Sequence, residues 1–510
     1  MSKKENILMK TTLSVTIVIM LSKGIGFIRE MIMAYYFGRD MVTDAYNSAY
    51  SLFYLPVLLF SSCITSTLVP LYIHKNHTDG RIEANRAASN TLNLFIAFSV
   101  IISAVMMIFA PSLVSLVYPG FADEAFTLTV KLTRIMMPAL AFFVAGIVLS
   151  TLLNAQEHYL AAQLTGFPLS IALITAAVFF SDASGIQAQA WGIVAAGVLQ
   201  IVILLPSLRK DYRYSPVFEP GNPDFKHLMA LAVPAVLSMA ANELNHMIDR
   251  MLASSLNPGD ISAMAYAFKL VMFMMGVLVV PLTTISFSKM SKQAANDNPA
   301  ELIPHVRSSV CLLAGVVLPI TAIAAAASTP IIRLAYGRGQ FGESSVLVTG
   351  VVFMFYVIGV PLFGLRDLLS RVYHALQNTK TTMIVTFIAM TCNIVFNIIL
   401  RPLMGVNGLA FATTIAALIS VALLTAGLMK SIRGLFDKSF YIELIKTVFA
   451  SGICLAVALL ISNLLPEPFG VINLFIHLIA VTASSLIAYA AACIVLKVSL
   501  FRSLKKIIRR

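Results

Sequence analysis

Charged residues are scarce in this sequence. They make up 12% of its 510 residues, whereas hydrophobic residues make up 59%. A soluble domain has about 25% charged and about 45–50% apolar residues, so this composition excludes a water-soluble fold. The strict alternation of apolar and polar residues that marks a transmembrane barrel is also missing. The sequence therefore predicts an all-α, polytopic membrane protein.

Paired cysteines and catalytic motifs are missing too. The chain has five cysteines, none with CxxC spacing, which argues against a zinc site and a disulfide framework. They all lie in apolar segments: Cys63, Cys311, Cys392, Cys454 and Cys493. The sequence contains no Walker A loop, HExxH, GxSxG or paired-carboxylate motif. We therefore expect no enzyme activity, no cofactor and no hydrolysis of ATP by this chain.

Long apolar runs follow one another along almost the whole sequence. Since about 20 apolar residues cross a bilayer, we expect about fourteen transmembrane helices. Their ranges are 11–37, 44–73, 91–117, 127–153, 159–181, 187–207, 227–254, 261–287, 309–335, 345–374, 381–400, 405–429, 441–464 and 471–496. Lysine and arginine concentrate in the tails and in the even-numbered connections, which predicts that both termini are cytoplasmic. The net charge of +13 then faces lipid headgroups and does not indicate nucleic-acid binding.

Two parts of the chain resemble each other at corresponding positions. Pro138-Ala-Leu-Ala-Phe-Phe and Leu152-Leu-Asn-Ala-Gln correspond to Pro361-Leu-Phe-Gly and Tyr373-His-Ala-Leu-Gln-Asn. We infer two pseudo-symmetric six-helix lobes, 1–218 and 219–435, followed by two further helices and a basic cytoplasmic tail in 436–510. Transporters built from such repeats bind substrate between the lobes and alternate its access by rocking them.

Cations inside the predicted spans point to function, because each costs roughly 2.5–3.5 kcal/mol at the bilayer centre. Lys23 and Arg29 lie in the first helix, and Lys269 lies at the equivalent depth of the eighth. Asp44 opens the second helix, where its carboxylate could orient a cation. Several cations around a cavity suit a diphosphate, which Arg and Lys bind through charge-assisted hydrogen bonds. We predict that these four residues bind the substrate.

Other polar residues within the spans could line the same cavity or be structural. These residues are Glu30, His246, Asp249, Arg250, Arg366 and Arg371. Arg366 with Asp367, and Asp249 with Arg250, could equally form neutral pairs. Asn393 and Asn397 lie one turn apart and could bind a small cation together with Thr413. Hydrogen bonding between helices is the preferred interpretation of these three, so no metal is predicted.

Three motifs carry a resemblance to a known family. They are Ser22-Lys-Gly-Ile-Gly-Phe-Ile-Arg29-Glu30 with Thr43-Asp-Ala-Tyr, then Ala265-Tyr-Ala-Phe-Lys-Leu, and Tyr373-His-Ala-Leu-Gln-Asn-Thr-Lys380. The sequence resembles the MurJ/MviN family of lipid II flippases. The resemblance implies a multidrug/oligosaccharidyl-lipid/polysaccharide exporter fold with a V-shaped cationic cavity, and a groove for the lipid tail at helices 13 and 14. It also implies substrate contacts at Lys23, Arg29, Asp44 and Lys269.

The same resemblance implies a place and a partner. It implies a multi-pass protein of the bacterial inner membrane that moves an undecaprenyl-diphosphate-linked saccharide to the outer leaflet for peptidoglycan synthesis and cell shape. Membrane lipids and the cell-wall synthesis machinery are the expected partners.

The chain departs from the family pattern in the second helix. The family carries an arginine pair there, whereas the run from Leu55 to Phe60 is uncharged. A flippase for another lipid-linked polysaccharide repeat and a cation-coupled drug exporter therefore stay open as alternatives. A membrane-embedded glycosyltransferase would need a catalytic carboxylate that no motif supplies, and a non-transporting scaffold would leave the cations unexplained.

Overall fold

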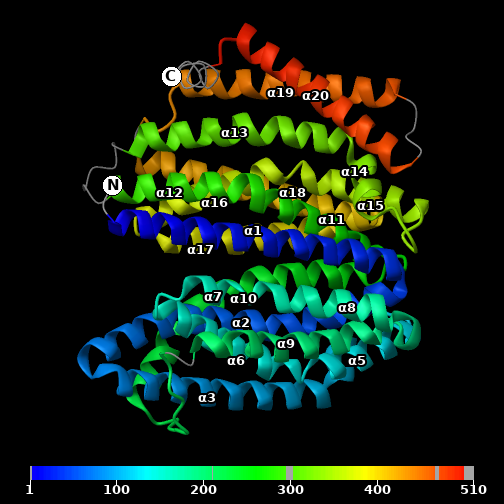
Figure 1. Ribbon diagram of the computed structural model, residues 1–510. Coiled ribbons are helices and arrows are strands. Elements are labelled where there is room, and N and C mark those ends of the chain that lie inside the picture. Colours follow the sequence, from blue (N-terminus) through cyan, green and yellow to red (C-terminus); the bar gives the residue numbers. More distant parts are fainter. Residues whose placement is uncertain (1–2, 209–210, 295–301, 433, 466–469, 499–510) are drawn as a thin grey trace. The chain divides into compact units, whose positions relative to one another are not determined.

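The computed structural model describes residues 3–208, 211–294, 302–432, 434–465 and 470–498. Within these ranges the chain forms α-helices, one π-helix and no strand (Figure 1). The predicted all-α class is confirmed. The chain divides into two compact units, Met1–Ser262 and Ala263–Arg510.

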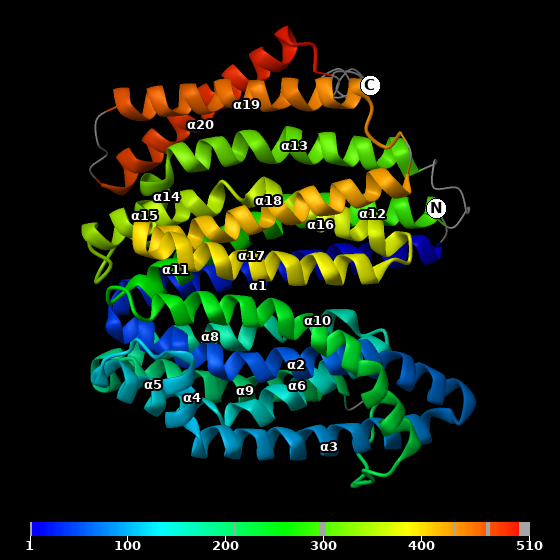
Figure 2. The same cartoon turned by 180° about the vertical axis from the view of Figure 1, so that it is seen from behind.

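The first unit contains ten complete helices and the first residues of an eleventh. They are α1 (Lys3–Phe37), α2 (Met41–Thr78), α3 (Gly80–Ile108), α4 (Ala110–Val117), α5 (Asp123–Met136), α6 (Ala139–Ala155), α7 (Tyr159–Gln163), α8 (Gly166–Ser184), α9 (Gln187–Leu208), α10 (Pro223–Ala253) and α11 (Asp260–Met274). Helix α2 is the centre, because α3, α5, α6 and α10 all pack against it (Figure 2). Its side chains Leu52, Phe53 and Ile64 are fully buried in this core. Helix α1 packs against α7 and α8.

The second unit contains the rest of α11 and the remaining helices. They are η1 (Met275–Val279), α12 (Val280–Ala294), α13 (Ile303–Ala326), α14 (Ser328–Tyr336), α15 (Glu343–Val357), α16 (Val360–Ala375), α17 (Thr379–Met404), α18 (Val406–Ser431), α19 (Lys438–Leu464) and α20 (Val471–Val495). Helix α18 packs against α15, α16 and α17. The two C-terminal helices, α19 and α20, pack against each other and against α13.

Large apolar side chains are exposed in both units. Leu116 and Phe179 in the first unit are 71% and 73% exposed, and Ile472 and Val495 in the second are 76% and 77% exposed. Apolar surface of this extent is not tolerated by a monomer in water and is normal against lipid. The exposed faces agree with a multi-pass membrane protein.

The number of helices that qualify as membrane spans by length and composition is lower than the fourteen predicted. Among the described residues, eleven helices are long and apolar enough to cross a membrane, and the pair α5–α6, bent by 45°, makes twelve. The predicted set of about fourteen also includes α1 and α10, which are 35 and 31 residues long. Both carry charged side chains, Arg29 and Glu30 in α1, and Glu243 and Arg250 in α10. Their membrane crossing stays a prediction.

The backbone repeats at corresponding places in the two halves. Helices α6 and α16 are each followed, two residues after their last residue, by a residue with positive φ, Glu157 at 63° and Gln377 at 58°. Helices α8 and α17 each end at a glycine of nearly identical conformation, Gly185 (φ 54°, ψ −141°) and Gly405 (φ 57°, ψ −135°). That region of φ and ψ is essentially restricted to glycine. These parallels support an internal duplication, while the lobe boundaries at 218 and 435 stay a prediction.

The connection between α9 and α10 is fixed to neighbouring helices. Asn93 of α3 donates to the Val217 carbonyl at 2.7 Å, and the Glu219 amide donates to the Asn90 side chain at 2.7 Å. Hydrogen bonds from His158 and Arg81 lower the pKa of the Asp211 carboxyl below its usual value. The predicted boundary near 218 thus falls within a well-anchored segment.

Candidate substrate-binding site

Arg29 is held by the carboxylate of its neighbour on α1. Its Nη2 and Nε atoms lie 2.5 Å and 3.2 Å from Oε1 of Glu30. The Arg29 side chain is 21% exposed and the Glu30 side chain 9%. Both donors bind the same carboxylate oxygen of Glu30. The remaining N–H groups of the guanidinium can therefore donate to an additional acceptor.

A column of tyrosines on α2 accompanies Arg29. Tyr46, Tyr50 and Tyr54 stack on successive turns, with ring centroids 6.2 Å and 5.4 Å apart. All three interact electrostatically with the Arg29 guanidinium. These tyrosines place aromatic rings and hydroxyl groups within electrostatic range of the cation, which suits a saccharide or phosphate ligand.

Helix α10 contributes a second arginine to the same unit. Arg250 donates to the Ser51 hydroxyl of α2, and its Nη1 lies 3.9 Å from Oε1 of Glu243. Glu243 also interacts electrostatically with Tyr54. Two ion pairs and the electrostatic interactions of Tyr54 thus link Arg29, Glu30, Tyr54, Glu243 and Arg250, which we name the polar cluster. It includes residues of α1, α2 and α10, and it contains Arg29, a predicted substrate-binding residue, and Arg250, one of the residues that could line the cavity.

Two further candidates lie on the same part of α10 as the polar cluster. Asp249 is 3% exposed and His246 is half-buried. Arg250 pairs with Glu243, seven residues and about two turns earlier on the same helix. Successive side chains of a helix point about 100° apart, which favours partners three, four or seven positions away.

The two predicted lysines have different surroundings. Lys23 is exposed on α1 and forms no ion pair with any described residue. Lys269 belongs to the second unit, where its ammonium lies 5.6 Å from the ring centroid of Tyr266. This is a cation–π contact. That Lys23 and Lys269 contact the same substrate as Arg29 stays a prediction.

The arginines of α16 differ from each other. Arg371 binds Asp367 one turn away, with Nε 3.1 Å from Oδ2, and its guanidinium lies 5.9 Å from the Phe287 ring. Arg366 is exposed, and its guanidinium lies 5.9 Å from the Phe363 ring. The suggested pairing of Arg366 with Asp367 is therefore replaced by an Asp367–Arg371 pair, because residues four apart share a helix face.

Asn393, Asn397 and Thr413 form a hydrogen-bonded connection between α17 and α18. Asn397 donates to Asn393 Oδ1 at 3.0 Å, and Asn393 donates to the Thr413 hydroxyl at 3.4 Å. The described residues contain no group of three histidine, cysteine, aspartate or glutamate side chains that could hold a metal ion. These contacts are of the kind that the preferred interpretation, hydrogen bonding between helices, requires.

Asp44 has a different environment from the one suggested by the sequence. It is 4% exposed, and its oxygens accept hydrogen bonds from the amides of Gly259 at 2.6 Å and Ser262 at 2.7 Å, and from the Ser262 hydroxyl. A carboxylate at a helix N-terminus stabilises both the free amides and the helix dipole. Asp44 thus orients the start of α11, while its predicted role at the substrate site stays a prediction.

A second contact, between Arg39 and Asp260, lies beside the hydrogen bonds of Asp44. Asp260, at the start of α11, accepts a hydrogen bond from Arg39 at 3.1 Å, just before α2 begins. Gly259 (φ 90°) lies against the Arg39 backbone, where an added Cβ would be 3.0 Å from the carbonyl oxygen. Gly120 is just as close to Ser255, since a Cβ would lie 2.5 Å from its Cα. We name this tightly packed region the outer junction, because the predicted topology places it on the external side of the membrane. It is defined by the contacts of Arg39, Asp44, Gly120, Gly259 and Asp260.

Comparison with known proteins now identifies the family. The family model described as lipid II flippase MurJ matches residues 33–480. The chain belongs to the MurJ family. The match begins after Arg29, so the first-helix motif adds to it independently, and it includes Asp44, Arg250 and Lys269.

Curated MurJ relatives cover most of the chain. A probable lipid II flippase MurJ of Rhizobium meliloti is 29% identical over 419 residues, which is 80% of this chain and 78% of the relative. A lipid II flippase MurJ of Burkholderia cenocepacia is 27% identical over 461 residues, 86% and 87% of the two chains.

Solved structures agree in fold. A lipid II flippase MurJ in an inward closed conformation superposes with a TM-score of 0.81 at 25% identity, covering 96% of this chain and 99% of that one. A multidrug resistance MATE family transporter in an inward-facing conformation has a TM-score of 0.69 at 14% identity and covers 81% of this chain and 94% of that one, a likeness in fold alone. The fold is that of MurJ and MATE transporters.

Two features of the MurJ-type site were missed by sequence reasoning. The tyrosines of α2 recur every four residues from Tyr46 to Tyr54, which places them on one helix face. Asp260 precedes Ala265 by as many residues as Asp44 precedes Ala49, so the internal repeat pointed to it. Spacing alone could have identified both.

Proposed function

We propose that this chain moves lipid II from the cytoplasmic to the outer leaflet, with its diphosphate bound at the polar cluster. The observation that carries the proposal is the arginine pair of the polar cluster, Arg29 and Arg250, in a chain of the MurJ family. Arginine binds phosphate oxygens through a planar fork of donors, and buried cations bind anions strongly because water is scarce around them.

The carboxylates of the polar cluster make binding reversible. Glu30 and Glu243 hold the two arginines while no substrate is bound. An arriving diphosphate has to displace or share these contacts. It therefore gains less binding free energy than it would gain from arginines without a carboxylate partner. A transporter needs such moderate affinity, because the substrate must leave again on the other side.

Transport by alternating access requires the outer junction to open and close. Asp44 fastens the start of α11 by two amide hydrogen bonds and a hydroxyl hydrogen bond, so opening must break a small and countable set of contacts. In our proposal both termini are cytoplasmic, the protein lies in the bacterial inner membrane, and the chain itself is not an enzyme. The substrate is an undecaprenyl-diphosphate-linked saccharide, and the cell-wall synthesis machinery consumes it outside.

Complementation tests the substrate. In a bacterium whose resident lipid II flippase can be depleted, expression of this chain should restore growth, whereas an Arg29→Ala variant at matched membrane abundance should not. A parallel strain that lacks a polysaccharide-repeat flippase serves as the specificity control. Restored polysaccharide export there, without rescue of the lipid II-depleted strain, would overturn the proposal in favour of the other substrate.

A further inference from the structure

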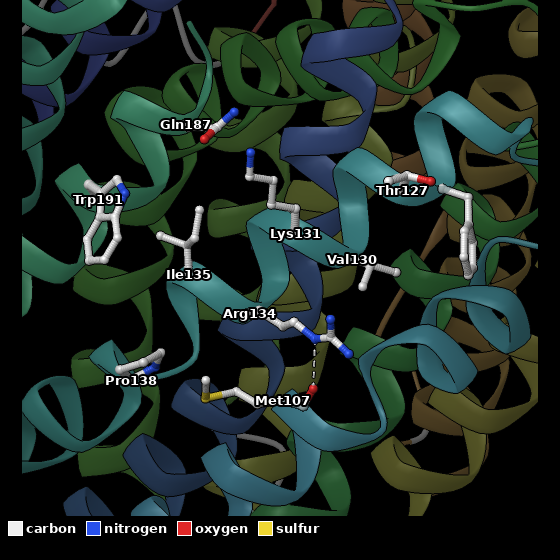
Figure 3. Close-up of a pocket in the computed structure, with 10 residues that line it drawn as sticks. Met107, Thr127, Val130, Lys131, Arg134, Ile135, Pro138, Gln187 and Trp191 are labelled. Atoms are coloured by element: carbon white, nitrogen blue, oxygen red, sulfur yellow. Dashed lines mark hydrogen bonds between the residues drawn. The ribbon is translucent and has the colours of Figure 1, made fainter. Parts of the chain in front are cut away.

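An open groove lies in the first unit between α3, α5 and α9. Its volume is about 660 Å³, and its lining includes Met107, Val130, Lys131, Arg134, Gln187 and Trp191 (Figure 3). We name it the Trp191 groove. Six of its ten lining side chains are apolar, and two are cations. The groove shares no lining residue with the polar cluster.

The predicted topology places the Trp191 groove at the outer side of the membrane. Helix α5 begins at Asp123 after a connection predicted to be external, and α9 begins at Gln187 after the next external connection. Trp191, one turn into α9, is 59% exposed and is the single tryptophan of the chain. Tryptophan is enriched at the membrane–water interface, where its amphipathic ring sits at headgroup level. The groove therefore faces the outer leaflet near its headgroups.

The two cations of the groove lack an acidic partner. Lys131 and Arg134 lie one turn apart on α5, both exposed, and neither forms an ion pair with a described residue. Arg134 donates through Nε to the Met107 carbonyl at 3.1 Å, which holds the guanidinium at the groove and leaves its terminal N–H groups unused by that bond (Figure 3). Lys131 extends toward Gln187 in the same view. Two positive charges beside apolar lining complement a ligand with an anionic head and an apolar body.

We propose that the Trp191 groove binds one anionic phospholipid of the outer leaflet. Its phosphate accepts hydrogen bonds from Arg134 and Lys131, and an acyl chain lies along Met107, Val130 and Trp191. The groove also includes Pro138, at the 45° bend between α5 and α6, so the lipid fills the concavity that a straight span would not leave. This site is separate from transport of the headgroup and does not depend on which saccharide is moved.

The single tryptophan gives a direct readout of occupancy. The full-length protein is reconstituted in phosphatidylcholine that contains either brominated phosphatidylglycerol or brominated phosphatidylcholine at equal mole fraction, since bromine quenches the fluorescence of an indole in contact with it. We expect the anionic lipid to quench Trp191 more strongly. Each cation near a membrane surface contributes about 1 kcal/mol of attraction to an anionic lipid, so each should contribute roughly fivefold to the preference.

Charge variants distinguish a specific lipid-binding site from cations that are only solvated at the membrane surface. Lys131→Gln with Arg134→Gln should abolish the preference, while Lys131→Arg with Arg134→Lys should retain it. Arg338→Gln, which removes an exposed cation of the second unit, is the matched control and should leave it unchanged. Inorganic phosphate should not relieve the quenching, because it cannot occupy the apolar lining. Equal quenching by the two lipids in the native protein, a preference that survives the double glutamine variant, or relief by phosphate would each overturn the proposal.

Discussion

Asp44 and Arg29 are both charged side chains of long helices in the first unit, and they are satisfied in different ways. Asp44 is 4% exposed and accepts three hydrogen bonds from the start of α11. Arg29 is 21% exposed and uses one carboxylate oxygen of its sequence neighbour. A charge whose partners come from a distant segment fixes that segment. A charge paired only with its own neighbour is held in place and still able to bind a ligand.

The first way to break this comparison is to remove Arg29. We expect Arg29→Ala to reduce lipid II transport by roughly 100-fold, because a hydrogen bond to a charged group contributes up to about 3 kcal/mol. Stability should be unchanged. Flux in vesicles and thermal unfolding, measured on the same preparations, are the readouts. Arg81→Ala, which removes a cation of α3 outside the polar cluster, is the control, and equal losses in both variants would contradict the role of Arg29.

The second way is to neutralise Asp44 without changing its size. Asp44→Asn turns one acceptor oxygen into an NH₂ group that opposes the donors of α11, and should lower the free energy of unfolding by about 2 kcal/mol. Thermal unfolding in detergent measures this loss. Asp40→Asn is the matched control, because the exposed Asp40 caps α2 through the Met41 amide at 2.7 Å and asparagine caps equally well. If the Asp44→Asn variant is as stable as the native protein, the structural role that distinguishes Asp44 from Arg29 is wrong.

Lys269 of the second unit tests whether another cation binds the substrate in the way we propose for Arg29. If it binds phosphate as Arg29 does, Lys269→Gln should lower transport roughly tenfold, about 1.4 kcal/mol, whereas Lys269→Arg should retain or improve it through its planar fork. Transport of lipid II analogues at matched protein levels gives the answer. Native flux in the glutamine variant would assign the phosphate to other residues, with Arg366 and Arg371 as the next candidates.

The smallest expected effect concerns the backbone parallels. Gly185→Ala and Gly405→Ala should each destabilise the protein by about 1 kcal/mol, and by similar amounts, because both keep a conformation unfavourable for alanine. An added Cβ meets nothing within 4 Å at either position, so the loss reports backbone strain alone. Gly342→Ala (φ −69°) has the same free space and should be neutral. Unequal effects at 185 and 405 would argue against a structural duplication.

Much of the fold could be predicted because the membrane simplifies the pattern. Apolar runs of bilayer length located the α2, α3 and α17 to α20 helices, and the motif around Asp44 indicated the family. The bend at Pro138 and the break between α15 and α16 at Gly359 could not be predicted from hydropathy, which does not detect a break inside an apolar run. The partners of Asp44 were hidden as well, because they are backbone amides of a segment more than 200 residues away, and amides carry no sequence signal.

The polarity of α1 and α10 has a consequence for biogenesis. The insertion machinery releases a helix into lipid according to its apolarity, and charged side chains delay that release. Helix α10 packs along α2, which is synthesised earlier, so a protein surface is ready for its polar side. Helix α1 packs against α7 and α8, which are synthesised later, so most of its packing partners are missing when it leaves the ribosome. We expect α1 to enter the bilayer stably only once α8 has been made, so that the helix carrying Arg29 is secured late in assembly.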